Sequence, residues 1–162
     1  MRPLSISPLS LLPCSPLEQI DAAEDAGFDA VGLRLQPALP TDIDVMADRS
    51  LRNAIERRIG NSRLQVLDVD VIRVDAQTKV SALLPLLSFA GSLGAQNLVF
   101  TSVSSEEYRT QDEPALIGKI GELCDTASNY GVRPVVEFIP FRGICSLDHA
   151  LRLASQVAHP NF

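Results

Sequence analysis

The feature that most constrains the fold is a phrase that recurs along the chain: a small residue, a glycine four residues later, and an apolar residue four further on. The clearest copies are Ala23, Gly27 and Val31; Ala90, Gly94 and Leu98; and Ala127, Gly131 and Val135, with a weaker copy around Gly60 and Leu64. Each glycine ends a helical pattern, where positive φ is needed, and an aliphatic run follows. The glycines are 33, 34 and 37 residues apart. The chain therefore predicts successive helix-to-strand units rather than an all-helical repeat.

Hydrophobic periodicity predicts five strands that alternate with five helices. Strands are expected over residues 4–7, 30–35, 64–71, 97–101 and 134–139. Helices are expected over about 16–26, 48–59 and 80–93. A polar loop over 102–113 is expected to lead into a fourth helix that extends to about residue 127, and a fifth helix is expected to begin after Ser146. Ser15 and Glu18 have capping-box spacing, with Pro16 at the first helical position. Pro85 is expected to kink the third helix or to mark its true start.

These units predict one α/β domain, residues 1–162, of parallel strands joined by right-handed crossovers. Two architectures fit: about five of the eight units of a TIM barrel, or a five-stranded doubly wound sheet. Strands covered on both faces are almost continuously apolar, whereas polar residues interrupt these strands near their carboxyl ends. A TIM barrel places its active site at that end. The pattern favours the barrel, and the doubly wound sheet stays open because it also binds ligands there.

Composition excludes several classes of partner. The 162 residues are 46% hydrophobic and carry a net charge of −6, which disfavours nucleic acid because duplex binding needs a basic surface. No stretch approaches the roughly 18 consecutive apolar residues of a membrane span, so no membrane partner is expected. Three cysteines, without metal-ligand spacing, predict reduced thiols in a cytoplasmic protein.

Residues 134–143 read Pro-Val-Val-Glu-Phe-Ile-Pro-Phe-Arg-Gly, and the segments 146–151 and 159–161 follow them. Together with the phrases at 26–35 and 67–73, this order resembles the xylose isomerase-like sugar phosphate isomerase/epimerase superfamily. The resemblance implies a parent TIM barrel of eight units, with a divalent metal held by carboxylates and a histidine at the tops of the later strands. The 162 residues then correspond to the N-terminal part of a (β/α)8 barrel.

The resemblance also implies the chemistry. The expected activity is a metal-dependent isomerase or epimerase of carbohydrate metabolism, which moves a proton on a sugar or sugar phosphate through an enediolate. The metal is Mn, Mg, Co or Zn, and most of its ligands lie outside this chain, so the chain alone is expected to have little or no activity. The alternatives are a lyase or dehydratase of the same superfamily, or a non-catalytic α/β binding module.

Glu137 and Arg34 are the first candidates for the site. By resemblance, Glu137 matches the first metal-binding glutamate, and it is also the catalytic candidate. Its alternative is a carboxylate paired inside the strand layer, with Arg34 as the partner. Arg34 is a candidate anchor for a substrate phosphate or carboxylate, because a guanidinium binds such groups through two hydrogen bonds. Its alternative is an internal ion pair.

Asp68, Asp70 and Arg142 complete the predicted substrate contacts. Asp68 and Asp70 are expected to contact substrate hydroxyls, or else to pair with Arg34 or Arg73. Arg142 follows Glu137 in a loop placed to touch the substrate. A partial barrel also leaves its first and fifth strands without neighbours, and such edges invite pairing. A homo-oligomer is therefore expected.

Overall fold

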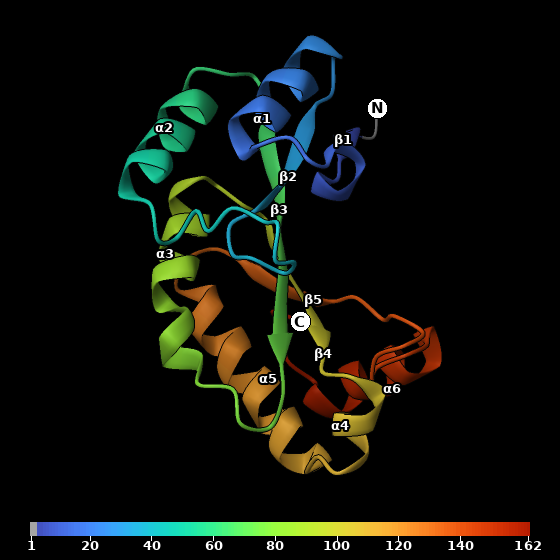
Figure 1. Ribbon diagram of the computed structural model, residues 1–162. Coiled ribbons are helices and arrows are strands. Elements are labelled where there is room, and N and C mark those ends of the chain that lie inside the picture. Colours follow the sequence, from blue (N-terminus) through green and yellow to red (C-terminus); the bar gives the residue numbers. More distant parts are fainter. Residues whose placement is uncertain (1–2) are drawn as a thin grey trace.

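Five parallel strands form one sheet in the order β1-β2-β3-β4-β5 in the computed structural model, which describes residues 3–162 (Figure 1). The strands are β1 (Ser5–Ile6), β2 (Ala30–Arg34), β3 (Gln65–Val74), β4 (Asn97–Ser102) and β5 (Arg133–Val136). The helices are η1 (Pro8–Leu11), α1 (Pro16–Asp25), α2 (Arg49–Gly60), η2 (Val80–Leu83), α3 (Leu84–Ser92), α4 (Ser105–Arg109), α5 (Glu113–Ser128) and α6 (Leu147–Val157).

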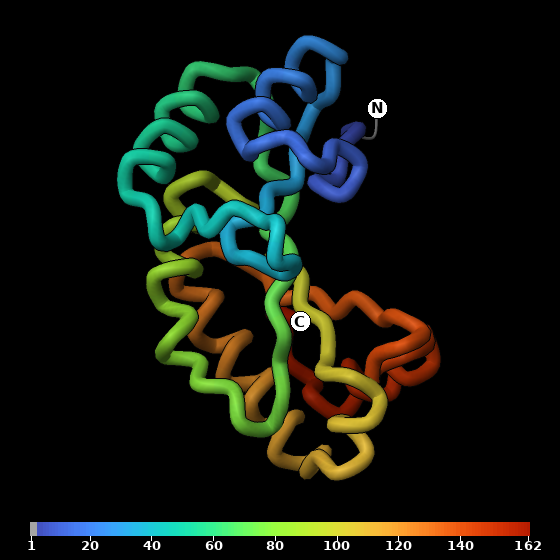
Figure 2. The backbone as a smooth tube through the Cα atoms, viewed as in Figure 1, coloured from blue at the N-terminus to red at the C-terminus, as the bar shows by residue number. Residues whose placement is uncertain are grey.

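The strand order decides between the two predicted architectures. Each strand pairs with the next one along the chain, and the order contains no reversal of the kind that defines a doubly wound sheet. With right-handed crossovers, such an order places the connecting helices on one face. Figures 1 and 2 show α2, α3 and α5 along the same side of the strands. The fold is therefore that of consecutive units of a barrel, and the doubly wound alternative does not hold.

The recurring pattern of alanine, glycine and apolar residue marks helix C-termini that end in the same way. Gly27, Gly94 and Gly131 have φ of +81°, +68° and +71°. After each glycine, the next amide donates to the carbonyl of the alanine that opens the phrase, as from Phe28 to Ala23 at 3.0 Å. This bond is the outer hydrogen bond of a Schellman motif. The weaker copy differs, because Gly60 is the last residue of α2 and does not have positive φ.

Two glycines provide a matched test of this conformational requirement. An added Cβ would meet no atom within 4 Å at Gly131, which has positive φ, or at Gly118, inside α5. We expect Gly131→Ala to lower the free energy of unfolding by about 1 kcal/mol. We expect Gly118→Ala to raise it by about 1 kcal/mol, because alanine is the better helix former. Urea unfolding of both variants measures the two changes, and shifts of the same sign would contradict this reading.

The remaining elements agree with the prediction in type, with differences at their ends. The capping box of Ser15 and Glu18 is present, with Pro16 as the first residue of α1. The helix expected over 80–93 is divided into η2 and α3, so Pro85 marks the start of the α-helix. The polar loop over 102–113 contains the short helix α4, which has a capping box of its own.

The fifth strand ends three residues earlier than predicted. After Val136 one more ladder bond forms, from the amide of Glu137 to the carbonyl of Phe100 at 2.8 Å. The chain then turns, and the amide of Ile139 donates to the carbonyl of Ile144 at 3.0 Å. Glu137 therefore lies just beyond β5, at the carboxyl end of the sheet.

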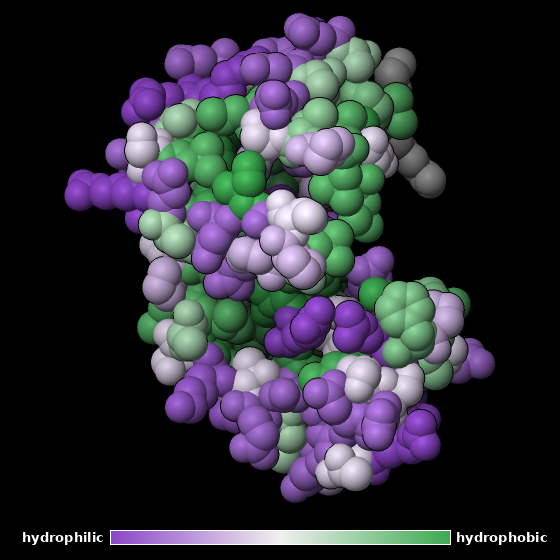
Figure 3. Space-filling view, in the orientation of Figure 1, coloured by the Kyte–Doolittle hydropathy of each residue, from purple (hydrophilic) through white to green (hydrophobic). Residues whose placement is uncertain are grey.

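The hydrophobic core lies between the sheet and its helices. Leu33 and Leu98 of the sheet are fully buried, as are Ile20, Ile55 and Leu123 of α1, α2 and α5. Figure 3 shows hydrophobic residues toward the middle of one face, with hydrophilic residues over both ends of the molecule. Among residues 3–162, every helix is too short or too polar to cross a membrane.

Candidate functional site

A cleft of about 390 Å³ opens at the carboxyl ends of the strands. Its walls come from the ends of β2, β3 and β4, from the loop after β5, and from η1 and η2. Three arginines line it, namely Arg34, Arg73 and Arg142, together with the buried Thr101. In a barrel of parallel strands this end carries the active site. The cleft is therefore the candidate site.

Arg34 forms an internal ion pair with two aspartates. The register of the sheet sets Arg34 opposite Asp70, and its Nε lies 3.2 Å from Asp70 Oδ1. Its Nη1 lies 3.1 Å from Asp42 Oδ2, an oxygen that also accepts the amides of Ala38 and Leu39. The structure thus bears out the ion-pair alternative for Arg34. The predicted pairing of Glu137 with Arg34 is wrong, since the sheet register brings Asp70 there instead.

The two carboxylates around Arg34 differ in their acidity. Burial favours the protonated form of Asp42, but hydrogen bonds from the amides of Leu39 and Ala38 and from Arg34 lower its pKa. Burial, and to a smaller extent the charge of Asp42, raise the pKa of Asp70 in spite of the charge and hydrogen bond of Arg34. Burial also opposes the charge of Arg34, yet the two aspartates raise its pKa overall. Asp42, which has the two additional amide bonds, is therefore the firmly ionised partner.

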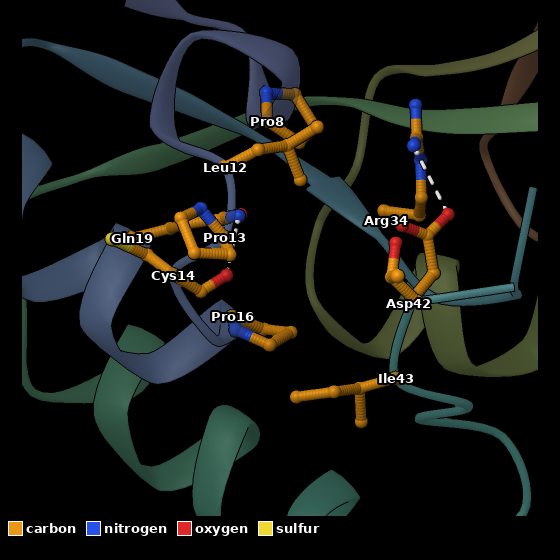
Figure 4. A pocket seen from close by; sticks show the side chains of 10 residues that line it. Pro8, Leu12, Pro13, Cys14, Pro16, Gln19, Arg34, Asp42 and Ile43 are labelled. Atoms are coloured by element: carbon orange, nitrogen blue, oxygen red, sulfur yellow. Dashed lines mark hydrogen bonds and ion pairs between the residues drawn. The ribbon is translucent and has the colours of Figure 1, made fainter. Parts of the chain in front are cut away.

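A second cavity, of about 80 Å³, adjoins this ion pair (Figure 4). Figure 4 shows Arg34 and Asp42 on one side, facing Pro8, Pro13 and Gln19 across the opening. The amide nitrogen of Gln19 donates to the carbonyl of Cys14 at 2.9 Å, and Gln19 Oε1 is buried without a partner among the described residues. The loops after β1 and β2 therefore pack around Arg34, which makes it a structural centre of this end of the sheet.

Asp68 lies within β3, outside the lining of the cleft, and has no ionic partner in the described part of the chain. Its carboxylate has no hydrogen bond or ion pair with any residue in the range 3–162, so pairing with Arg34 or Arg73 is not observed. A Cβ on Gly32, its neighbour in the sheet, would lie 2.5 Å from Asp68 Oδ1, so the glycine makes room for the carboxylate. Burial, and then the charge of Asp70, raise the pKa of Asp68.

The raised pKa of Asp68 gives a pH-dependent prediction. Well below pH 4, Asp68 is protonated in the folded and the unfolded chain, and Asp68→Asn changes stability little. As the pH rises, Asp68 ionises in the unfolded chain before it ionises in the folded chain. The free energy of unfolding of the wild type therefore falls, whereas that of Asp68→Asn does not change for this reason. The gain in the free energy of unfolding from Asp68→Asn is therefore expected to grow with pH, as measured by urea unfolding. A gain that stays constant or falls with pH would contradict the assignment.

Glu137 is exposed at the end of β5, and within residues 3–162 its carboxylate forms no hydrogen bond or ion pair. The carboxylate is a suitable oxygen ligand for a divalent cation. The described part of the chain, however, holds no group of three or more histidine, cysteine, aspartate or glutamate residues that could bind a metal ion. The residues present therefore do not form a metal site by themselves.

Arg142 lies in the loop after β5, and this loop is hydrogen-bonded to α4. Its amide donates to the carbonyl of Ile139 at 2.8 Å, and its carbonyl accepts Ser105 Oγ at 2.9 Å. Its guanidinium carbon lies 5.8 Å from the centre of the Phe141 ring. Arg142 thus lines the cleft, and its contact with a substrate stays a prediction. Sequence reasoning missed Asp42, and it considered Arg73 only as an ion-pair partner; no motif distinguishes either residue from ordinary loop and surface charges.

The chain matches one protein family in sequence and several solved structures in fold. The family model for the xylose isomerase-like TIM barrel matches residues 20–162. A structure of IOLI protein with a bound zinc atom has 18% identity and a TM-score of 0.79, over 99% of this chain and 60% of that one. None of the curated proteins matches the chain.

Two further structures are enzymes. The probable 3-DHS dehydratase AsbF from Bacillus anthracis has 16% identity and a TM-score of 0.76. D-psicose 3-epimerase from Clostridium cellulolyticum H10 has 14% identity and a TM-score of 0.75. Each match covers 99% of this chain and 61% of the other, so the chain spans about three fifths of these neighbours. The similarity of the structures concerns the fold, whereas the family model identifies the family. The chain belongs to the xylose isomerase-like TIM barrel family.

Proposed function

We propose that residues 1–162 are the N-terminal part of a (β/α)8 barrel that acts as a metal-dependent isomerase or epimerase on a sugar or sugar phosphate. The observation that carries the proposal is the cleft at the carboxyl ends of consecutive parallel strands, lined by arginine and hydroxyl side chains, in a chain of this family. The neighbouring psicose 3-epimerase structure, which contains D-tagatose, supports a sugar substrate.

The chain's own residues divide into two roles in this proposal. Arg34, paired with Asp70 and Asp42, holds the end of β2 against β3 and the following loop. Glu137 presents an exposed carboxylate at the end of β5, where it can bind a cation or exchange a proton with a substrate carbon. Arg142 binds the substrate. In this proposal the ion pair of Arg34 with Asp70 and Asp42 is structural, and Glu137 supplies the carboxylate that reacts.

The proposed metal is Mn, Mg, Co or Zn, and the zinc atom in the IOLI protein structure supports a divalent ion. Glu137 would supply one carboxylate ligand. Because residues 3–162 bring no three such donors together, the other ligands have to come from polypeptide outside them. The 162 residues alone are therefore proposed to be inactive or nearly so. The three cysteines are free, which fits the proposed cytoplasmic location.

A dehydratase is the second candidate, because the AsbF structure matches the chain with the same coverage as the epimerase. Both reactions remove a proton from a carbon next to a carbonyl group. An isomerase or epimerase returns a proton to the substrate, whereas a dehydratase expels a hydroxyl group as water. The fate of the substrate therefore distinguishes the two enzymes, and a binding module performs neither step.

The test uses the protein as its host makes it, incubated in D2O with Mn²⁺ and a set of ketoses and ketose phosphates. The proposal predicts deuterium at the carbon next to the carbonyl, detected by NMR, with loss of exchange after EDTA treatment. Loss of water with a new double bond from a cyclic hydroxy acid would identify a dehydratase instead. Binding of a sugar without exchange or elimination would favour the non-catalytic module.

A further inference from the structure

The positive charges of the cleft are unequally compensated. Arg34 is paired with two aspartates, so it brings little free charge to the cleft. Arg73, at the end of β3, and Arg142 form no ion pair with another described residue. Within residues 3–162 the cleft wall contains no acidic side chain. The cleft therefore has two available guanidinium groups, and neither of them is Arg34.

Two residues that line the cleft each have a buried polar atom without a partner among the described residues. Arg142 Nε is one of them, and Thr101 Oγ1, in a residue that is 2% exposed, is the other. A buried polar group without a partner costs about 1–3 kcal/mol. A guanidinium can only donate hydrogen bonds, and a hydroxyl can also donate one. An oxygen acceptor in the cleft is the kind of partner that both atoms lack, and the uncompensated charges of Arg73 and Arg142 favour an acceptor with negative charge.

Glu107 is an acidic side chain on which the charges of both free arginines act, and it is already engaged. Its carboxylate caps α4, where it accepts the amide of Ser104 at 3.0 Å and Ser104 Oγ at 2.6 Å. These bonds to Ser104, and then the charges of Arg73 and Arg142, lower the pKa of Glu107. Because the carboxylate stays with Ser104, it does not occupy the arginine groups in the cleft.

The backbone around Arg142 is held in place before any ligand arrives. The amide of Gly143 donates to the carbonyl of Val103 at 3.0 Å, and that of Ile144 donates to Ser102 Oγ at 2.7 Å. A Cβ at Gly143 would overlap the ring of Tyr108, so the loop packs closely on α4. The loop and β4 thus form one unit that carries both Arg142 and Thr101.

We propose that Arg142, Arg73 and Thr101 form an oxyanion site, and that the substrate carries a phosphate or carboxylate group that binds there. The planar guanidinium matches either group through paired hydrogen bonds. This inference rests on the proposed function and narrows it, because the substrate becomes an anionic polyhydroxy compound. It also replaces the expectation that Arg34 is the anchor.

Isothermal titration calorimetry at low ionic strength measures binding to the protein as its host makes it and to variants expressed in the same host. The probes are inorganic phosphate, glycerol 3-phosphate, glycerate and uncharged glycerol. We expect phosphate to bind, and Arg142→Met to weaken it at least about tenfold. The control is Arg133→Met, an exposed arginine at the opposite end of the sheet, which should leave the affinity unchanged. Tighter binding of glycerol 3-phosphate or of glycerate identifies which anion the site takes.

Two results would overturn the oxyanion site: no phosphate binding to the wild type, or equal affinity in the wild type and both arginine variants. Thr101→Val keeps the shape of the side chain and should weaken phosphate binding less than Arg142→Met does. The proposed function fails separately. If neutral ketoses exchange deuterium and phosphate does not bind, the isomerase proposal is supported and the oxyanion site is contradicted. If phosphate binds and no sugar exchanges deuterium, the oxyanion site is supported and the isomerase proposal is contradicted.

Discussion

Arg34→Met is expected to lower the free energy of unfolding by about 3–5 kcal/mol, the range found when one partner of a buried ion pair is removed. Arg34 is 8% exposed, and the substitution leaves the carboxylates of Asp70 and Asp42, whose side chains are 13% and 4% exposed, without their cation. Asp42 keeps two amide donors, whereas Asp70 loses its only ion pair among the described residues. Urea unfolding at neutral pH, followed by circular dichroism, measures the loss.

Two controls separate the charge effect from the change of shape. Combining Arg34→Met with Asp70→Asn removes one of the two uncompensated charges and should recover part of the stability, so the effects of the two changes are not additive. The deficit of Arg34→Met should also shrink in acid, because protonation removes the charges that Arg34 compensated. A loss below about 1 kcal/mol, typical of an exposed pair, would show that the ion pair is not a structural centre.

Glu137→Gln is expected to lower kcat/KM at least about 100-fold in the protein as its host makes it, since a positioned acid or base contributes about 10²–10⁴ in rate. The substitution keeps the size of the side chain and removes its charge. Glu137 is exposed and has no partner in the described part of the chain, so folding should be nearly unaffected. The exchange assay in D2O measures the loss, and metal analysis of the purified variant tests the ligand role.

The matched control for this variant is Glu106→Gln. Glu106 is also an exposed glutamate, but it lies in the first turn of α4 rather than at the end of a strand. Its substitution should leave kcat/KM within about twofold of the wild type. Equal activity of Glu137→Gln and Glu106→Gln would contradict the proposed catalytic role of Glu137.

Local sequence signals were sufficient for the five strands and for the longer helices of the fold. Gly27, Gly94 and Gly131 mark helix ends because positive φ strongly favours glycine, a requirement that is visible in the sequence. The alternation of polar and apolar residues in the strands favoured the barrel, and the observed strand order agrees with it. The helix α4 was missed because its five residues carry no periodic apolar pattern, although Ser104 and Glu107 have capping-box spacing.

The candidate site was less predictable, because its geometry depends on contacts between residues distant in the sequence. Whether Arg34 binds a substrate or an internal carboxylate depends on the register between β2 and β3, which sets it against Asp70. Asp42 reaches Arg34 through a loop with no motif. Conversely, Arg73 and Arg142 are candidates for binding an anion because they have no ion-pair partner in residues 3–162, and a sequence does not reveal such an absence.

We propose that these five strands are the first part of a barrel enzyme, and the intact mass of the protein isolated from its host is the measurement that tests this proposal. A family barrel of about 250 residues has a mass of roughly 30 kDa, and we expect a polypeptide of that size that begins with the 162 residues described. A mass of 17.5 kDa, that of the 162 residues alone, would contradict the proposal and favour a binding module with a finished sheet.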